Sequence, residues 1–285
     1  MFDTVIVGFD GTDTGNDGLV LSIGLAKAFG SRVVLAYIYD EGISGEAIEA
    51  ARERTEHAEA ILAGAREQVS QALAVEFSAL PASSPADGLH DLAVRADADL
   101  IVIGSRRLGP WTKSALGAVS ESVMRAAPCA VVVASRGYRA GGGFVPQTIG
   151  VGWIPTKEGE DALAVSCRIA RATGGRVEVV TTASSSATVE DLDARARHAV
   201  EDVLATLGHN VAVKVHARVG AAPDELVRRS SEMDLIVLGS RGYGPPRTML
   251  SGSVSSKVVP VAHCPVMILG GSSRVEAQSR AARPT

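Results

Sequence analysis

The chain has 285 residues, of which 46% are apolar and 21% are charged, and its mean hydropathy is +0.17. This composition excludes a mainly disordered chain and provides enough apolar mass for one or two hydrophobic cores. A formal net charge of −4 argues against a general polyanion binder, and an aromatic content of 4% argues against stacking platforms for single-stranded nucleic acid.

The start of the chain and its cysteines indicate the compartment. Acidic Asp3 comes early, and no basic segment precedes an apolar one, so we expect no signal peptide. No apolar stretch approaches the roughly 18 residues of a membrane span. Three cysteines are an odd number and too few for a disulfide scaffold, which favours a reducing compartment. We therefore expect a soluble, cytoplasmic protein without membrane or nucleic-acid partners.

Strand and helix signals alternate along the whole chain. Short Val-, Ile- and Leu-rich runs predict strands in the first half at residues 4–9, 32–39, 73–79, 99–103 and 129–134. Amphipathic, Ala-rich stretches such as 16–29 and 46–72 predict helices between them. The second half repeats the pattern with strands near 148–153, 176–181, 211–216, 234–238 and 265–269. This alternation predicts an α/β fold with two doubly wound, five-stranded parallel sheets.

An internal repeat sets the domain organisation. The run Asp-Leu-Ile-Val-Ile-Gly-Ser-Arg beginning at Asp99 returns almost unchanged at Asp234, an offset of 234 − 99 = 135, and Cys129 returns as Cys264 at the same offset. Residues 25–30 resemble 169–174 at an offset of 144, so the second copy is about nine residues shorter in between. We predict domains at 1–137 and 148–270, a Gly-rich linker at 138–147 and a flexible tail at 271–285.

The segment after the fourth strand of the second copy carries the strongest binding signal. Ligands of open α/β sheets bind beyond the carboxyl ends of the strands. Here Gly239, Gly242, Gly252 and Ser253 follow the spacing Gly-x2-Gly-x9-Gly-Ser. Glycines let the backbone approach a ligand closely, and the free N–H groups of a helix start attract phosphate. The alternative is a tight turn with Ser253 as a helix cap.

That spacing resembles the nucleotide loop of the universal stress protein family. The opening Val-Ile-Val-Gly-Phe-Asp-Gly-Thr of residues 5–12 and the Asp-Leu-Ile-Val-x-Gly-Ser-Arg run are also typical of it, and the resemblance covers roughly residues 1–270. It implies adenine nucleotide alpha hydrolase-like domains with strand order 3-2-1-4-5. It also implies ATP, with or without Mg²⁺, at the ends of the first and fourth strands. Members are commonly dimers, so the two domains could pair as an internal pseudo-dimer, with a further homodimer as an option.

The resemblance also implies which residues contact the nucleotide. The aspartate after the first strand would contact the nucleoside, and the Gly-rich loop would hold the phosphates. Carried over position by position, the candidate nucleotide-binding residues are Asp10, Gly11, Thr12, Gly104, Arg107, Gly117, Ser120, Gly239, Arg241, Gly242, Gly252, Ser253, Val254 and Ser255.

The two copies depart from the family pattern in opposite ways. The first copy keeps Asp10 but has Arg107 in place of the second loop glycine and Ala118 in place of the serine. The second copy keeps the loop but has Ile154 and Pro155 where Asp10 and Gly11 stand, which removes a carboxylate able to accept hydrogen bonds from ribose hydroxyls. Our hypothesis is that both sites bind adenine nucleotide with unequal affinity. The first would hold the nucleoside better and the second the phosphates.

No other catalytic pattern competes with this interpretation. The chain has no Walker-type phosphate loop, no dinucleotide fingerprint and no hydrolase serine elbow, and its histidines lack metal-site spacing. We predict no catalytic residue and no metal site, and we expect Cys129 and Cys264 to be buried packing residues. The predicted function is an ATP-binding regulatory protein of the stress response. A nucleotide-independent interaction module with degenerate loops, and a slow ATPase, remain alternatives.

Overall fold

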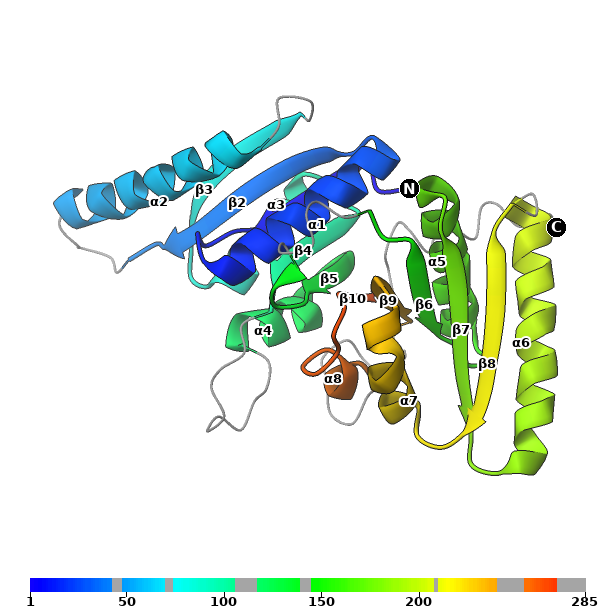
Figure 1. The fold of residues 1–285 in the computed structure, drawn as a ribbon. Coiled ribbons are helices and arrows are strands. Elements are labelled where there is room, and N and C mark those ends of the chain that lie inside the picture. Colours follow the sequence, from blue (N-terminus) through cyan, green and yellow to red (C-terminus); the bar gives the residue numbers. More distant parts are fainter. Residues whose placement is uncertain are drawn as a thin grey trace. The chain divides into compact units, whose positions relative to one another are not determined.

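A computed structural model describes residues 1–42, 48–69, 74–105, 117–138, 145–207, 210–239 and 254–270. The chain divides into two compact units, Met1–Phe144 and Val145–Thr285, called unit 1 and unit 2 below (Figure 1). Most of the predicted linker, residues 139–144, and the whole predicted tail, 271–285, lie outside the described residues.

Unit 1 alternates strands and helices around a parallel sheet. Its elements are β1 (Thr4–Gly8), α1 (Asp13–Phe29), β2 (Arg32–Asp40), α2 (Ile48–Gln68), β3 (Val75–Ala82), α3 (Pro85–Arg95), β4 (Leu100–Gly104), α4 (Ala118–Ala126) and β5 (Ala130–Ala134). The strands lie in the order β3-β2-β1-β4-β5, and every adjacent pair is parallel.

Unit 2 repeats this arrangement. Its elements are β6 (Thr148–Gly152), α5 (Lys157–Thr173), β7 (Arg176–Ala183), α6 (Ser186–Leu207), β8 (Ala212–Val219), α7 (Ala222–Arg229), the 3-10 helix η2 (Ser230–Glu232), β9 (Leu235–Leu238), α8 (Val254–Val258) and β10 (Val266–Ile268). Its strands lie in the order β8-β7-β6-β9-β10, again with parallel neighbours. The predicted fold class and the strand order 3-2-1-4-5 are therefore confirmed in both units.

Helices cover both faces of each sheet. Because crossovers between parallel strands are right-handed, this strand order puts α1 and α2 on one face of the unit 1 sheet and α3 and α4 on the other. On that second face α3 packs against α4. In unit 2, α5 packs against α6 on one face and α7 against α8 on the other. Val5, Ile6 and Val7 of β1 are completely buried, because the central strand is covered on both sides.

Equivalent caps fix the ends of the first helix in each unit. Thr12 and Thr156 are the N-caps of α1 and α5, and their side chains accept from the backbone N–H of Gly15 and Gly159. The helices end at Gly30 and Gly174, which have φ of 69° and 70° in the left-handed region. Among the described residues, no helix is both long and apolar enough to cross a membrane.

Candidate functional site

The turn after β1 is held by its own short polar side chains. The Oδ1 atom of Asp10 accepts hydrogen bonds from Thr12 N at 3.0 Å and from Thr12 Oγ1 at 2.5 Å. Gly11 between them has φ of 74°, a conformation that favours glycine. Because Asp10 is exposed while its Oδ1 is fixed, the turn presents a positioned carboxylate at the carboxyl end of the sheet.

The end of β4 lies directly against the first turn of α1. A Cβ added to Gly104 would stand 2.0 Å from the carbonyl oxygen of Thr14 and 3.0 Å from the backbone nitrogen of Gly15. A Cβ on Gly18 would in turn lie 3.3 Å from Gly104 N. Because Gly104 and Gly18 have no side chains, the end of β4 can lie beside the Asp10 turn.

The start of α4 is tied to the same place. Gly117 is the N-cap of α4 with φ of −62°, and among the described residues no side chain caps the free N–H groups of the first turn. Ser120 is 3% exposed, and its hydroxyl donates to the carbonyl oxygen of Gly104 at 3.3 Å. The structure thus brings together Asp10, Gly11, Thr12, Gly104, Gly117 and Ser120. A phosphate contact from Ser120 would require exchange of the bond to Gly104.

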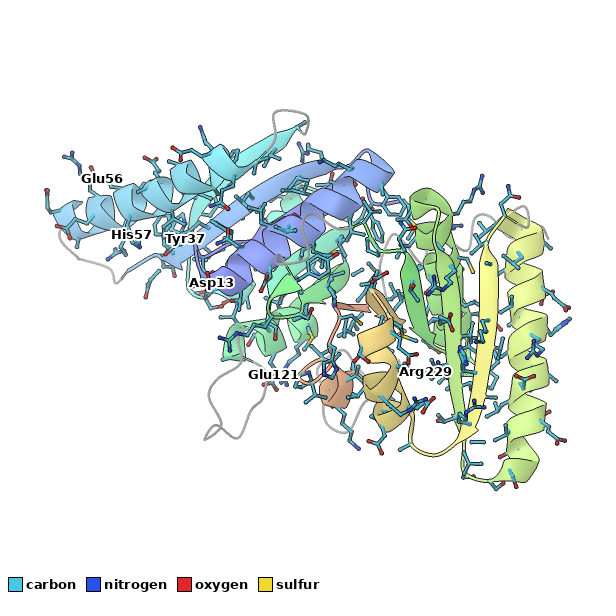
Figure 2. All side chains as sticks on the ribbon, in the orientation of Figure 1. Asp13, Tyr37, Glu56, His57, Glu121 and Arg229 are labelled. Atoms are coloured by element: carbon cyan, nitrogen blue, oxygen red, sulfur yellow. The ribbon has the colours of Figure 1, made fainter. Side chains whose placement is uncertain are left out.

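Each of the two helix starts that the structure describes at this end of unit 1 carries an acidic side chain. Asp13 lies in the first turn of α1 and Glu121 in the first turn of α4 (Figure 2). Glu121 is paired with Arg125 at 3.1 Å, which offsets its charge. Acidic side chains at a helix start lower its attraction for an anion. Of these two helix starts, the start of α4 therefore carries the less negative net charge.

Unit 2 keeps the backbone of this turn without the carboxylate. Thr156 N donates to the carbonyl oxygen of Ile154 at 2.7 Å, whereas the equivalent Thr12 N donates to the side chain of Asp10. A main-chain acceptor thus replaces the carboxylate. Gly239 repeats the Gly104 packing, because a Cβ on it would lie 2.4 Å from the carbonyl oxygen of Glu158. The sequence difference at Ile154 is therefore a change in chemistry and not in architecture.

Of the remaining predicted site residues, the structure describes those at the start of α8. Arg107, Arg241, Gly242, Gly252 and Ser253 lie outside the described residues. Val254 and Ser255 begin α8 and are half-buried. In unit 2 the described part of the predicted site is thus Gly239, Val254 and Ser255.

Two positions at this end of unit 1 were missing from the sequence prediction. The carbonyl group of Thr14 packs against Gly104, and a Cβ on Gly15 would lie 2.6 Å from Asp10 Oδ1. The signal was present in the sequence, because the Thr-x-x-Gly of Thr12 and Gly15 returns as Thr156 and Gly159 at the offset of 144. Thr12 as a helix cap, together with Gly15 three residues later, would have predicted the start of α1.

The cysteines lie away from this chemistry. Cys129, Cys167 and Cys264 are buried and free, which confirms the predicted packing role of Cys129 and Cys264. Burial raises the pKa of each thiol to about 12, so none is a thiolate near neutral pH. Within the described residues, no group of three or more His, Cys, Asp or Glu side chains could hold a metal ion.

The fold and its repetition define the class of protein: two adenine nucleotide alpha hydrolase-like α/β domains in one chain. The sequence model of the universal stress protein family matches residues 1–135 and 147–270. The chain belongs to the universal stress protein family, with two copies of its domain.

Individual relatives agree with the family match. The "Universal stress protein in QAH/OAS sulfhydrylase 3'region" of Thermus aquaticus is 31% identical over 137 residues, covering 47% of this chain and 98% of its own. A universal stress protein of Mycobacterium tuberculosis is 31% identical over 186 residues, and the match spans 60% of this chain and 61% of that protein. The crystal structure of a universal stress protein from Archaeoglobus fulgidus has a TM-score of 0.74 at 22% identity, covering 93% of this chain and 95% of its own.

Proposed function

We propose that this protein is an ATP-binding regulator of a stress response, in which the nucleotide is a ligand and not a substrate. The observation that carries the proposal is the convergence of Asp10, the start of α1 and the start of α4 at one end of the unit 1 sheet, where no described side chain caps α4. A carboxylate can accept hydrogen bonds from ribose hydroxyls, and uncapped helix N–H groups suit phosphate. Bound nucleotide would stabilise whichever conformation binds it better.

The two sites are proposed to be unequal. Unit 1 has the fixed carboxylate of Asp10, whereas Ile154 gives unit 2 none. Unit 2 has the complete glycine and serine pattern in its loop, whereas Arg107 and Ala118 interrupt the pattern in unit 1. We propose that unit 1 recognises the nucleoside more strongly and that unit 2 recognises the phosphates more strongly.

Calorimetric titration with ATP tests the site assignment. Asp10→Asn keeps an oxygen for Thr12 but removes the charge, and it should weaken the binding event assigned to unit 1 on the order of tenfold. Gly242→Arg gives unit 2 the residue type that unit 1 has in its loop and should weaken the other event. Asp91→Asn removes an exposed charge from α3 and serves as the control. If Asp10→Asn and Gly242→Arg both bind ATP as the unaltered protein does, the assignment is wrong.

Nucleotide released on denaturation of the purified protein separates ligand from substrate. Released ATP supports binding without rapid turnover. ADP alone would point to hydrolysis and so to the slow ATPase. A protein that releases no nucleotide, and that binds no added ATP, would be the nucleotide-independent interaction module.

A further inference from the structure

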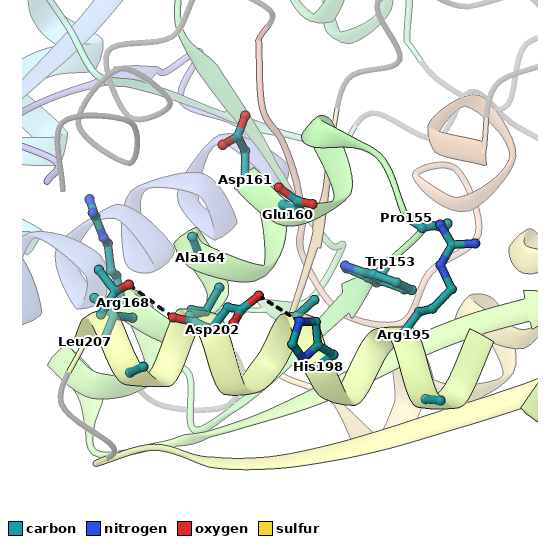
Figure 3. A pocket seen from close by; sticks show the side chains of 15 residues that line it. Trp153, Pro155, Glu160, Asp161, Ala164, Arg168, Arg195, His198, Asp202 and Leu207 are labelled. Carbon is teal, nitrogen blue, oxygen red and sulfur yellow. Dashed lines mark hydrogen bonds and ion pairs between the residues drawn. The ribbon is translucent and has the colours of Figure 1, made fainter. Parts of the chain in front are cut away.

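Unit 2 contains a groove of about 890 Å³ between α5 and α6 (Figure 3). It extends from Trp153 and Pro155, directly after β6, to Leu207 at the end of α6. A volume of this size is within the range of roughly 300–1,000 Å³ that is typical of small-molecule sites. Most of the groove lies along two helices, whereas the nucleotide site proposed above lies beyond the strand ends. The two regions adjoin at Pro155, the residue equivalent to Gly11.

The indole of Trp153 is a buried donor that no described residue satisfies. Trp153 is 2% exposed, its Nε1 is buried, and the part of the chain that the structure describes offers that atom no hydrogen-bond partner. Its backbone nitrogen donates to Val180 O at 2.9 Å, which fixes the residue beside β7. Figure 3 shows the nitrogen edge of the indole turned toward the middle of the groove, between Glu160 and His198. Buried indole N–H groups usually have a partner, so this donor indicates a missing acceptor.

The walls of the groove combine small apolar residues with balanced charges. Ala164, Ala199 and Val203 contribute half-buried apolar surface from the two helices. The lining carries the carboxylates of Glu160, Asp161 and Asp202 and the guanidinium groups of Arg168 and Arg195. Lys157 Nζ lies 3.0 Å from Asp161 and offsets the third negative charge. A groove with balanced charge has no net attraction for a polyanion such as ATP.

We propose that this groove binds an uncharged, elongated, apolar molecule that carries one hydrogen-bond acceptor, such as a carbonyl oxygen. The apolar body lies between α5 and α6, and the acceptor receives the hydrogen bond from Trp153 Nε1. This site is separate from nucleotide binding and does not depend on it.

Unit 1 supplies the natural control. Phe9 is the residue equivalent to Trp153, because 153 − 9 = 144, and it is likewise buried after the first strand of its unit. Trp153→Phe therefore keeps an aromatic ring of a kind already accepted at this position and removes only the N–H donor and part of the ring area.

Titration of the full chain with prodan, an uncharged naphthalene ketone whose emission depends on its surroundings, tests the proposal. We expect saturable binding of one prodan per chain with blue-shifted emission. Trp153→Phe should weaken this binding at least fivefold, and Ala164→Leu, which fills the groove from α5, should abolish it. Ala60→Leu adds the same side chain to an exposed position of α2 and should leave binding unchanged. Circular dichroism of each variant verifies that it is folded.

Three results would overturn the proposal: no saturable binding to the unaltered protein, equal binding by the folded Trp153→Phe variant, or displacement of prodan by saturating ATP. Displacement would make the groove part of the nucleotide site. Weakened ATP binding at the unit 1 site of Asp10→Asn, with unchanged prodan binding, supports both sites independently. Failure of one proposal is therefore distinguishable from failure of the other.

Discussion

Gly104 lies so close to Thr14 that a Cβ on the glycine would stand 2.0 Å from the threonine carbonyl oxygen. In unit 2 a Cβ on Gly239 would likewise stand 2.4 Å from the carbonyl oxygen of Glu158. In both units the first glycine of the predicted nucleotide loop is required for packing a strand end against a helix start. This requirement exists whether or not a nucleotide binds, and it sets where the loop leaves the sheet.

We predict that Gly104→Ala and Gly64→Ala change stability in opposite directions. Gly104→Ala forces apart two backbone segments and should lower the free energy of unfolding by at least about 2 kcal/mol. Gly64 is an exposed interior residue of α2, and a Cβ there meets nothing within 4 Å, so Gly64→Ala should raise it by about 0.5–1 kcal/mol. Urea unfolding measures both. Equal small effects would contradict the close approach of Gly104.

The sequence predicted the elements of the fold better than the geometry of the site. The inner strands were predictable because strands covered on both faces read as continuous apolar runs. The predicted third strand stopped at residue 79, whereas β3 continues to Ala82 through Pro81. That strand is the outermost of the unit 1 order, where a proline without an N–H group is tolerated.

Side-chain partners could not be predicted from spacing alone. Ser120 was predicted as a phosphate contact, but the spacing gives no indication that its hydroxyl lies against Gly104 O. The repeat shows that Asp99 and Asp234 are equivalent. It does not show that each carboxylate accepts hydrogen bonds from backbone N–H groups about a hundred residues earlier in the chain. Such long-range contacts follow from topology, which the repeat predicts only in outline.

Asp99 and Asp234 should both be important for stability. Asp99 Oδ2 accepts from Asp3 N at 2.7 Å and Thr4 N at 3.0 Å, and Asp234 Oδ2 accepts from Gln147 N at 3.0 Å and Thr148 N at 2.8 Å. Asp99→Ala leaves two N–H groups at the start of β1 without their acceptor and should cost about 2–4 kcal/mol in chemical unfolding. Asp99→Asn keeps an oxygen and should cost less than half as much.

Asp234→Ala should reproduce this loss at the start of β6. The bonds have the same lengths within a few tenths of an ångström, so the two alanine variants should differ by less than about 1 kcal/mol. An Asp99→Ala variant as stable as the unaltered protein would show that water replaces the carboxylate without loss.

The three cysteines should be unreactive in the native protein. Burial raises the pKa of the Cys129 thiol to about 12, and the nearby charge of Asp99 contributes in the same direction. Cys167 and Cys264 are raised to about 12 as well, again by burial. With iodoacetamide at pH 8, native alkylation should be at least roughly 100-fold slower than in 6 M guanidinium, because only the thiolate reacts. Mass spectrometry counts the modified sites, and one rapidly alkylated native thiol would contradict the burial.

Protonation of Glu225 should lower the stability of unit 2 in acid. Its carboxylate accepts from Arg228 Nη2 at 2.6 Å and Arg229 Nε at 2.8 Å. The hydrogen bond from Arg228 is the main cause that lowers the pKa of Glu225 from 4.5 to about 2, with Arg229 contributing. Because the folded pKa lies below the unfolded one, this stabilisation is complete above about pH 4.5 and is lost as the pH falls toward 2.

Replacement of Glu225 isolates that contribution. At pH 7, Glu225→Gln should lower the free energy of unfolding by about 1–2 kcal/mol, after allowance for solvent screening of exposed Arg228. The difference from the unaltered protein should shrink between pH 4.5 and 2, because protonated Glu225 no longer pairs with either arginine. Glu56→Gln breaks the exposed pair with Arg52 and should change stability by less than about 0.5 kcal/mol at either pH. A difference for Glu225→Gln that stays constant from pH 7 to pH 2 would show that the ion pairs with Arg228 and Arg229 do not stabilise the fold.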